Sequence, residues 1–217
     1  MMTNLFSVFD PCTGVISLNW LSTFIFLIVM PYKFWLIPNK ISLCLTNILK
    51  SLQSEISMLM PYSGIQLIML SLFLFILINN LMGLMPYVFT SSSHLIYSLT
   101  MALPLWLSMM IYGWVNKYNS MFSHLVPVGT PPVLMPFMVL IETVSNIIRP
   151  GSLSVRLTAN MIAGHLLMSL LGNNTSSLIL MISTMFVYVG LMMFELAVAM
   201  IQSYVFMTLS TLYSSEI

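Results

Sequence analysis

Residues 154–161 read Ser-Val-Arg-Leu-Thr-Ala-Asn-Met and place Arg156 in the middle of a long apolar segment. The guanidinium stays charged in any protein site because its pKa lies above about 12. Holding that charge at the depth of a lipid bilayer costs about 2.5 to 3.5 kcal/mol on insertion scales. Arg156 therefore predicts an ion pathway or a charged partner within the membrane. A structural ion pair between membrane helices is the alternative, and it requires an acidic partner.

The composition is that of a helical membrane protein. Of the 217 residues, 59% are hydrophobic and 5% are charged, and the mean hydropathy is +1.01. A soluble domain carries about 25% charged residues, so we expect a single all-α integral domain surrounded by lipid. The net charge of +1 argues against a nucleic-acid partner. Cys12 and Cys44 lie in separate segments and indicate neither a disulfide nor a metal site, and no cofactor is expected.

About five membrane helices and one interfacial helix are expected, because a membrane span needs about 20 mostly apolar residues. In residues 39–60 the apolar side chains recur every three or four positions, with Lys40 and Lys50 on the other face. This pattern is typical of an amphipathic helix that lies along the membrane surface. The expected elements are a span at 17–37 that ends at Pro38, the surface helix at 39–60, spans at 65–89 and 95–115, and long helices at 133–171 and 178–213.

The two long helices are expected to form a hairpin around the turn at 172–177. The first of them is too long for one perpendicular crossing, so we predict a tilt, or a kink at Pro150. If the hairpin is symmetrical about its turn, facing residue numbers sum to about 349, and Arg156 lies close in depth to Glu195. The same register separates His165 from Glu195 by about 16 Å, so a direct bond between them is not expected.

Lysines set the expected orientation. Lys33, Lys40 and Lys50 follow the first span and Lys117 follows the third, so these loops are expected on the same, non-translocated side of the membrane. With five spans, the C-terminus lies on this lysine side and the N-terminus lies on the opposite side.

A polar stripe runs along the first long helix in line with Arg156. At about 100° per residue, Arg149 and Glu142 lie one and two heptads before Arg156 and within about 40° of its direction. Small residues on this stripe allow another helix to approach closely, so the stripe suits a partner that carries charge. Ordinary packing between spans would explain the small residues but not two arginines. The stripe also contains Ser145, Ser152 and Asn160.

The second long helix carries Glu195 and Gln202 on one face, about two turns apart. A carboxyl at membrane depth indicates a role in moving protons or ions, and a hydrogen-bonded packing carboxyl is the alternative. His165 points roughly away from Arg156 on its own helix. Its position is equally compatible with a proton relay and with a packing histidine.

Six motifs spread along the chain point to one family. They are NNLMGLMPY at 79–87, PVGTP at 127–131, IETVS at 141–145, Arg149-Pro150, RLTANMIAGHLL at 156–167 and ELAVAMIQSYVF at 195–206. Together they closely resemble the subunit a family of mitochondrial F-type ATP synthases. The match covers nearly the whole chain and is loosest in the N-terminal region.

The resemblance implies a non-catalytic subunit that carries protons across the mitochondrial inner membrane beside a rotating ring of c subunits. The peripheral stalk and other membrane subunits of the synthase would be its further partners. The N-terminus would face the intermembrane space and the C-terminus the matrix. In this family, two offset half-channels reach the ring from opposite membrane faces. Arg156 aligns with the stator arginine, which promotes deprotonation of the ring carboxylate and prevents a proton short-circuit.

On this interpretation, Glu142 serves the half-channel from the matrix, and Glu195 serves the half-channel from the intermembrane space, with His165 as a candidate relay. Gln202 and Asn160 are further candidates for the proton path. Arg149, Ser145 and Ser152 would support the stripe around Arg156. Many relatives carry glutamine or another residue at the position of Arg149, so the resemblance gives less weight to Arg149 than to Arg156.

Three other classes of protein fit less of the sequence. A haem-binding redox subunit needs paired histidines between spans, whereas His94, His124 and His165 are isolated. An intramembrane zinc protease needs a His-Glu-x-x-His motif, which the sequence lacks. A self-contained ion channel is disfavoured, because small residues around an arginine stripe suit a moving partner better than a closed pore.

Overall fold

A computed structural model describes residues 5–12, 16–32, 35–60, 62–126, 131–173 and 178–215, and every regular element within these ranges is a helix. The all-α fold predicted from the composition is confirmed. Lys33 and most of the predicted hairpin turn lie outside the described residues. The α-helices are α1 (Ile25–Val29), α2 (Lys40–Leu59), α3 (Ser63–Gly83), α4 (Leu95–Asn116), α5 (Tyr118–His124), α6 (Met135–Asn173) and α7 (Leu178–Ser215). Short 3-10 helices are η1 (Leu5–Phe9), η2 (Leu18–Phe24) and η3 (Ser91–Ser93).

Four of these helices, α3, α4, α6 and α7, are long and apolar enough to cross a membrane. The bounds of α4, α6 and α7 lie within two residues of the predicted ones. α3 ends at Gly83 rather than at 89, because the chain turns there ahead of Pro86. The short helix α5 was not predicted, and it follows α4 directly after Lys117.

The first predicted span, 17–37, requires a correction. Among the described residues of this range, helical structure covers only Leu18–Val29, and its first seven residues are a 3-10 helix. Met30 is extended (φ −63°, ψ 126°) because Pro31 follows it, and a residue that precedes proline is disfavoured in the α region. Where about five membrane helices were expected, the described residues thus contain four long apolar helices and the shorter apolar helix Leu18–Val29.

α2 begins and ends within one residue of the predicted surface helix. Its Leu52 and Ile56 are buried against α3 and α7. The hydroxyl of Tyr204 on α7 donates a hydrogen bond of 3.1 Å to the Glu55 carboxylate of α2. These contacts join α2 to the bundle, and its position along the membrane surface stays a prediction.

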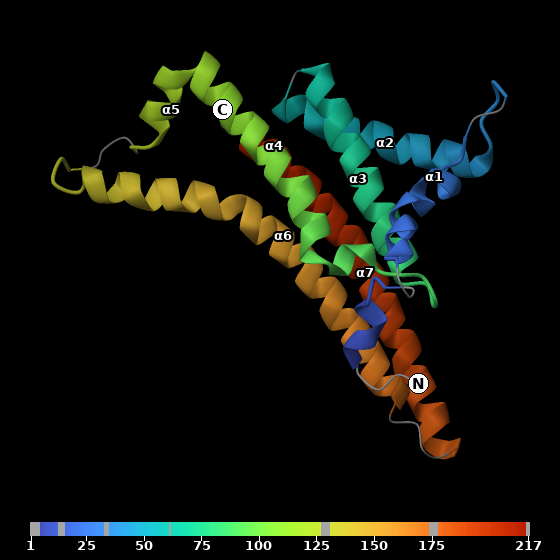
Figure 1. Cartoon of the computed structure of the whole chain (residues 1–217). Coiled ribbons are helices and arrows are strands. Elements are labelled where there is room, and N and C mark those ends of the chain that lie inside the picture. The colour runs from blue at the N-terminus through green and yellow to red at the C-terminus, as the bar shows by residue number, and fades with distance from the viewer. Residues whose placement is uncertain are drawn as a thin grey trace.

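The four long helices form the body of the protein (Figure 1). α3 packs along α7 and α4 packs along α6. One buried cluster takes residues from all four: Ile76 of α3, Ala102 of α4, Leu153 and Leu157 of α6, and Phe206 of α7. In a bilayer, lipid tails are as apolar as these side chains, so close packing rather than the hydrophobic effect favours this association.

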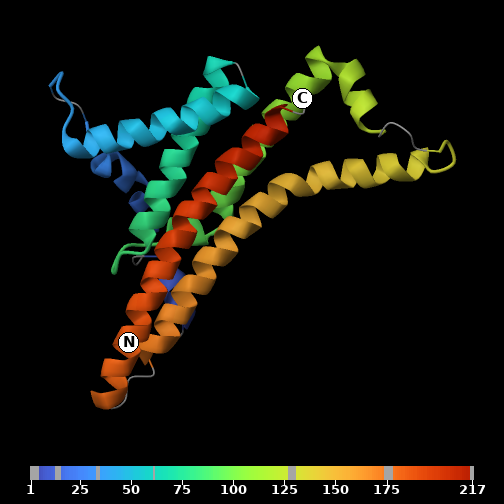
Figure 2. The ribbon, with the colours of Figure 1, turned by 180° about the vertical axis from the view of Figure 1, so that it is seen from behind.

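α6 leaves the bundle in its N-terminal half. Figures 1 and 2 show α6 bending, so that this half extends away from α3 and α7 as an arm. The helix continues through Pro150 without a break. α5 and the end of α4 lie above the arm (Figure 1).

The described lysines gather at one end of the bundle. Tyr62 at the start of α3, Lys117 after α4 and Ser215 at the end of α7 line one cavity, so these three helix ends meet. α2, with its lysines, packs at the same end (Figure 1). At the opposite end, the Phe9 ring of η1 contacts the His165 ring of α6, with ring centroids 6.2 Å apart. The N- and C-terminal parts of the described chain thus lie at opposite ends.

The register of the α6–α7 hairpin differs from the predicted one. The Glu195 carboxyl lies against Gly164, and the Arg149 guanidinium lies over the Tyr213 ring. Facing residue numbers therefore sum to about 360 rather than to about 349. The symmetrical estimate was wrong because the first turns of α7 extend beyond the end of α6. Thus Gly172, near the end of α6, lines one cavity with Thr184 and Tyr188 rather than with the first residues of α7.

Candidate functional site

Arg156 lies on the outer surface of α6. Its side chain is exposed, and so are those of Ser152, Ala159 and Ala163, which share its face of the helix. Leu157 beside it is buried in the bundle, with 2% of its surface exposed. The one ion pair found within the described ranges does not involve Arg156. The alternative of a structural ion pair finds no support in this part of the chain, and the guanidinium is open to a partner outside it.

The corrected register changes the depth of the groups around Arg156. A sum of about 360 places Arg156 level with Tyr204 and within about one turn of Gln202. Glu195 lies level with Gly164, about 12 Å from Arg156 along α6 at 1.5 Å per residue. The prediction that Arg156 and Glu195 lie close in depth is wrong.

Glu142 and Arg149 form an ion pair on the α6 arm. Glu142 Oε1 lies 3.7 Å from Arg149 Nη2, and the side chains of Arg149 and Glu142 are 23% and 38% exposed. The Arg149 Cζ atom lies 4.7 Å from the centroid of the Tyr213 ring, in the last turns of α7. Arg149 thus turns toward α7 and Glu142, whereas Arg156, one heptad later, is exposed. The two arginines lie on one helix but have different surroundings.

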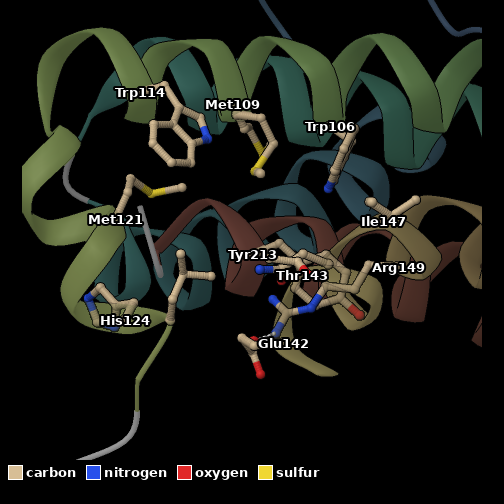
Figure 3. A pocket seen from close by; sticks show the side chains of 13 residues that line it. Trp106, Met109, Trp114, Met121, His124, Glu142, Thr143, Ile147, Arg149 and Tyr213 are labelled. Carbon is tan, nitrogen blue, oxygen red and sulfur yellow. Dashed lines mark ion pairs between the residues drawn. The ribbon is translucent and has the colours of Figure 1, made fainter. Parts of the chain in front are cut away.

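These charges line a cavity between the α6 arm and the ends of α4, α5 and α7 (Figure 3). Its volume is about 510 Å³, far above the roughly 10 to 15 Å³ that a cavity needs in order to hold one water. It lies at the lysine end, because α4 and α5 meet at Lys117. The lining residues are Trp106, Met109, Met110, Trp114, Met121, His124, Leu125, Glu142, Thr143, Asn146, Ile147, Arg149 and Tyr213.

Glu195 is enclosed at the other end of the hairpin. It is 5% exposed, and its carboxyl occupies the space that a side chain at residue 164 would fill. An added Cβ atom at residue 164 would overlap the carboxyl, so a larger residue there would force the Glu195 side chain to move. Glu195 therefore lies level with the residue next to His165, and the predicted separation of about 16 Å is wrong. No hydrogen bond joins Glu195 to His165 among those found in the described residues.

Membership of a family follows from comparison with known proteins. The sequence profile described as "ATP synthase A chain" matches residues 13–215. The protein named ATP synthase subunit a of Anopheles quadrimaculatus is 57% identical over 225 residues, and that of Drosophila melanogaster is 57% identical over 223, with each pair covered over its whole length. The chain belongs to the ATP synthase subunit a family.

This membership confirms the resemblance seen in the motifs. The chain is a multi-pass mitochondrial membrane protein and the non-catalytic, proton-translocating stator subunit of an F-type ATP synthase. The redox-subunit and protease alternatives are set aside.

The other predicted site residues of this family member differ in exposure. Ser145, Asn160 and Gln202 are half-buried, and Ser152 is exposed on the face that carries Arg156. His165 is half-buried, and its ring lies beside the Gly83 backbone of α3. Its Nε2 atom is buried without a partner in the described part of the chain. The structure therefore brings His165 to α3 and to the level of Glu195.

Sequence reasoning missed a group of buried polar residues on α3, η3 and α4. Asn79 donates a 3.0 Å hydrogen bond to the hydroxyl of Tyr97, whereas Asn80 and Ser92 are fully buried and their side chains have no partner within the described residues. Buried polar atoms of this kind are usually satisfied by ordered water. The asparagines inside an apolar span were visible in the sequence. Their proximity to η3 and α6 was not, because it depends on the turn after α3.

Proposed function

We propose that this chain moves protons along the c-ring of the synthase by two half-channels, with Arg156 as the fixed positive charge between them. The observation that carries the proposal is an exposed guanidinium on a face of small residues, with no ion pair to any described residue. Such a face allows the helix of a ring subunit to approach closely. The ring, the peripheral stalk and other membrane subunits are the proposed partners.

The charge of Arg156 performs two tasks in this mechanism. It stabilises the ionised form of a ring carboxyl that passes beside it, so the proton leaves the carboxyl there. It also repels hydronium and so blocks a direct leak from one half-channel to the other. Each proton that crosses 100 mV releases about 2.3 kcal/mol, which is the energy available to turn the ring.

The half-channel from the matrix is proposed at the lysine end, along the cavity that contains Glu142. Glu142 lies about 21 Å along α6 from Arg156, so water in the cavity would carry the proton over much of this path. The carboxylate is partly exposed and lines this cavity together with residues of α4 and α5. The proposed orientation places the C-terminus in the matrix and the N-terminus in the intermembrane space.

The half-channel from the intermembrane space is proposed at Glu195, with His165 as its neighbour. Both lie at the end of the bundle opposite the lysines. Buried polar atoms of His165, Asn80 and Ser92 that lack a partner among the described residues support a hydrated path there, since each requires a hydrogen bond. Glu195 and Glu142 then lie on opposite sides of Arg156 in depth, as two offset half-channels require.

Replacing Arg156 with alanine in the assembled synthase tests this proposal. Arg156→Ala should abolish ATP synthesis driven by a proton gradient, because the ring carboxyl no longer meets a compensating charge. Val155→Ala is the matched control: Val155 is exposed on the same helix next to Arg156 but points about 100° away from it, and the substitution should leave synthesis unchanged. Assembly of both complexes is checked by native electrophoresis. ATP synthesis at a normal rate by the Arg156→Ala complex would refute the proposal.

A further inference from the structure

The two arginines of α6 occupy different environments although they are one heptad apart. Arg156 is exposed on the face of small residues, whereas Arg149 has 23% of its side chain exposed. Arg149 contacts a carboxylate on its own helix, Glu142, and an aromatic ring on α7, Tyr213. These contacts draw the charge of Arg149 away from the face that carries Arg156.

Arg149 lies where the α6 arm separates from the bundle. Tyr213 belongs to the last turns of α7, and α6 diverges from α7 beyond this point (Figures 1 and 2). In Figure 3, the Arg149 side chain lies between Tyr213 and Glu142 at the edge of the cavity. One guanidinium therefore links the end of α7 to the carboxylate of the arm.

A guanidinium is suited to this link for two physical reasons. Its planar face stacks on an aromatic ring, while its edge donates several hydrogen bonds to a carboxylate in a fixed geometry. A partly exposed ion pair alone constrains a side chain weakly, because water competes for both charges. Stacking on the Tyr213 ring restricts the conformations of the Arg149 side chain. The guanidinium therefore attracts the Glu142 carboxylate from a more fixed position.

We propose that Arg149 is a positioning residue: anchored on Tyr213, it holds the Glu142 carboxylate at the wall of the cavity at the lysine end. The same contacts keep the charge of Arg149 away from the face of α6 that carries Arg156 and is proposed to contact the ring. This inference rests on the proposed role of Glu142 in the matrix half-channel. Arg149 would then affect proton transfer by positioning Glu142, and Tyr213 would anchor the Arg149 side chain.

The test uses the assembled synthase in sealed inner-membrane vesicles, with the rate of ATP-driven proton pumping as the readout. Arg149→Gln should slow pumping by about three- to tenfold, the range expected for losing a partly exposed ion pair together with a cation–π contact. Tyr213→Leu should slow pumping by a similar factor. Tyr213→Phe, the matched control, keeps the ring and should pump at the normal rate. If Arg149→Gln does not assemble, the contrast between Tyr213→Leu and Tyr213→Phe decides.

A double-mutant cycle separates positioning from a general structural role. In the Glu142→Gln background there is no carboxylate to hold, so adding Arg149→Gln should not slow pumping further. If the double variant shows the full additional loss, Arg149 acts independently of Glu142 and the proposal is overturned. Normal pumping by Tyr213→Leu would overturn the role of the anchor. Normal pumping by Glu142→Gln alone would instead refute the proposed matrix half-channel, so the two failures are distinguishable.

Discussion

Gly164 offers a direct test of the environment of Glu195. A Cβ atom at this position would overlap the carboxyl carbon and oxygens of Glu195, and these are its three nearest neighbours. Gly164→Ala therefore forces the Glu195 carboxyl to move. Inserting a methyl group into a packed site costs about 1 to 3 kcal/mol. Alanine recovers about 1 kcal/mol through its higher helix propensity, so the net destabilisation should be about 0 to 2 kcal/mol.

The effect on transport should exceed the effect on stability. If Glu195 passes protons from this enclosed position, displacing its carboxyl should reduce ATP-driven proton pumping by about tenfold or more, as removal of a proton-transfer group does. Thermal stability of the assembled complex and pumping rate are measured on the same vesicles. A large loss of rate with little loss of stability is the expected result.

Two further variants make this test specific. Gly151 lies on the same helix, and a Cβ atom added there would meet no other atom within 4 Å, so Gly151→Ala should pump normally. Glu195→Asp shortens the side chain by one methylene, so adding it to Gly164→Ala should recover part of the lost rate. Normal pumping by Gly164→Ala would refute the reasoning, since the carboxyl would then function without its observed position.

Three other substitutions follow from the same structure. Arg156→Lys should fail to support gradient-driven ATP synthesis, because a compact ammonium differs in reach and loses its proton more readily when buried; near-normal synthesis would contradict the role of the guanidinium. Glu142→Gln should slow ATP synthesis without increasing passive proton leak, which is measured as the decay of an imposed pH gradient; a faster decay would contradict it. Leu157→Ala should destabilise the bundle by about 2 to 5 kcal/mol, because Leu157 is 2% exposed in the shared core; an unchanged melting temperature of the complex would contradict this packing.

The helices were predictable because their signals are local. The apolar runs of α4, α6 and α7 are bounded by polar or turn residues, so their ends could be placed within two residues. The first span was predicted to run to residue 37, but its helix ends at Val29, ahead of Pro31. The effect of Pro31 on Met30 was present in the sequence, but the apolar residues on both sides outweighed it in the prediction.

The residues of the site were predictable by type, and their spatial relations were not. Arg156, Glu142 and Glu195 are recognisable because ionisable side chains are rare at membrane depth. Which of these residues lie at the same depth depends on how far α7 extends beyond the end of α6. No local pattern in the sequence indicates that distance. The contact between Arg149 and Tyr213 was missed for the same reason, since it joins residues far from the turn of the hairpin.

The asymmetry of the hairpin has a consequence for the charge of Arg156. A symmetrical turn would place Glu195 about 3 Å in depth from Arg156, where a carboxylate of the same chain could neutralise the guanidinium. The observed register moves Glu195 about 12 Å away and encloses it at Gly164. It also separates Glu142 from the level of Glu195 by about 33 Å along α6, compared with about 18 Å in the symmetrical case. One structural offset therefore keeps the charge of Arg156 available to a partner and moves the two carboxylates toward opposite membrane faces.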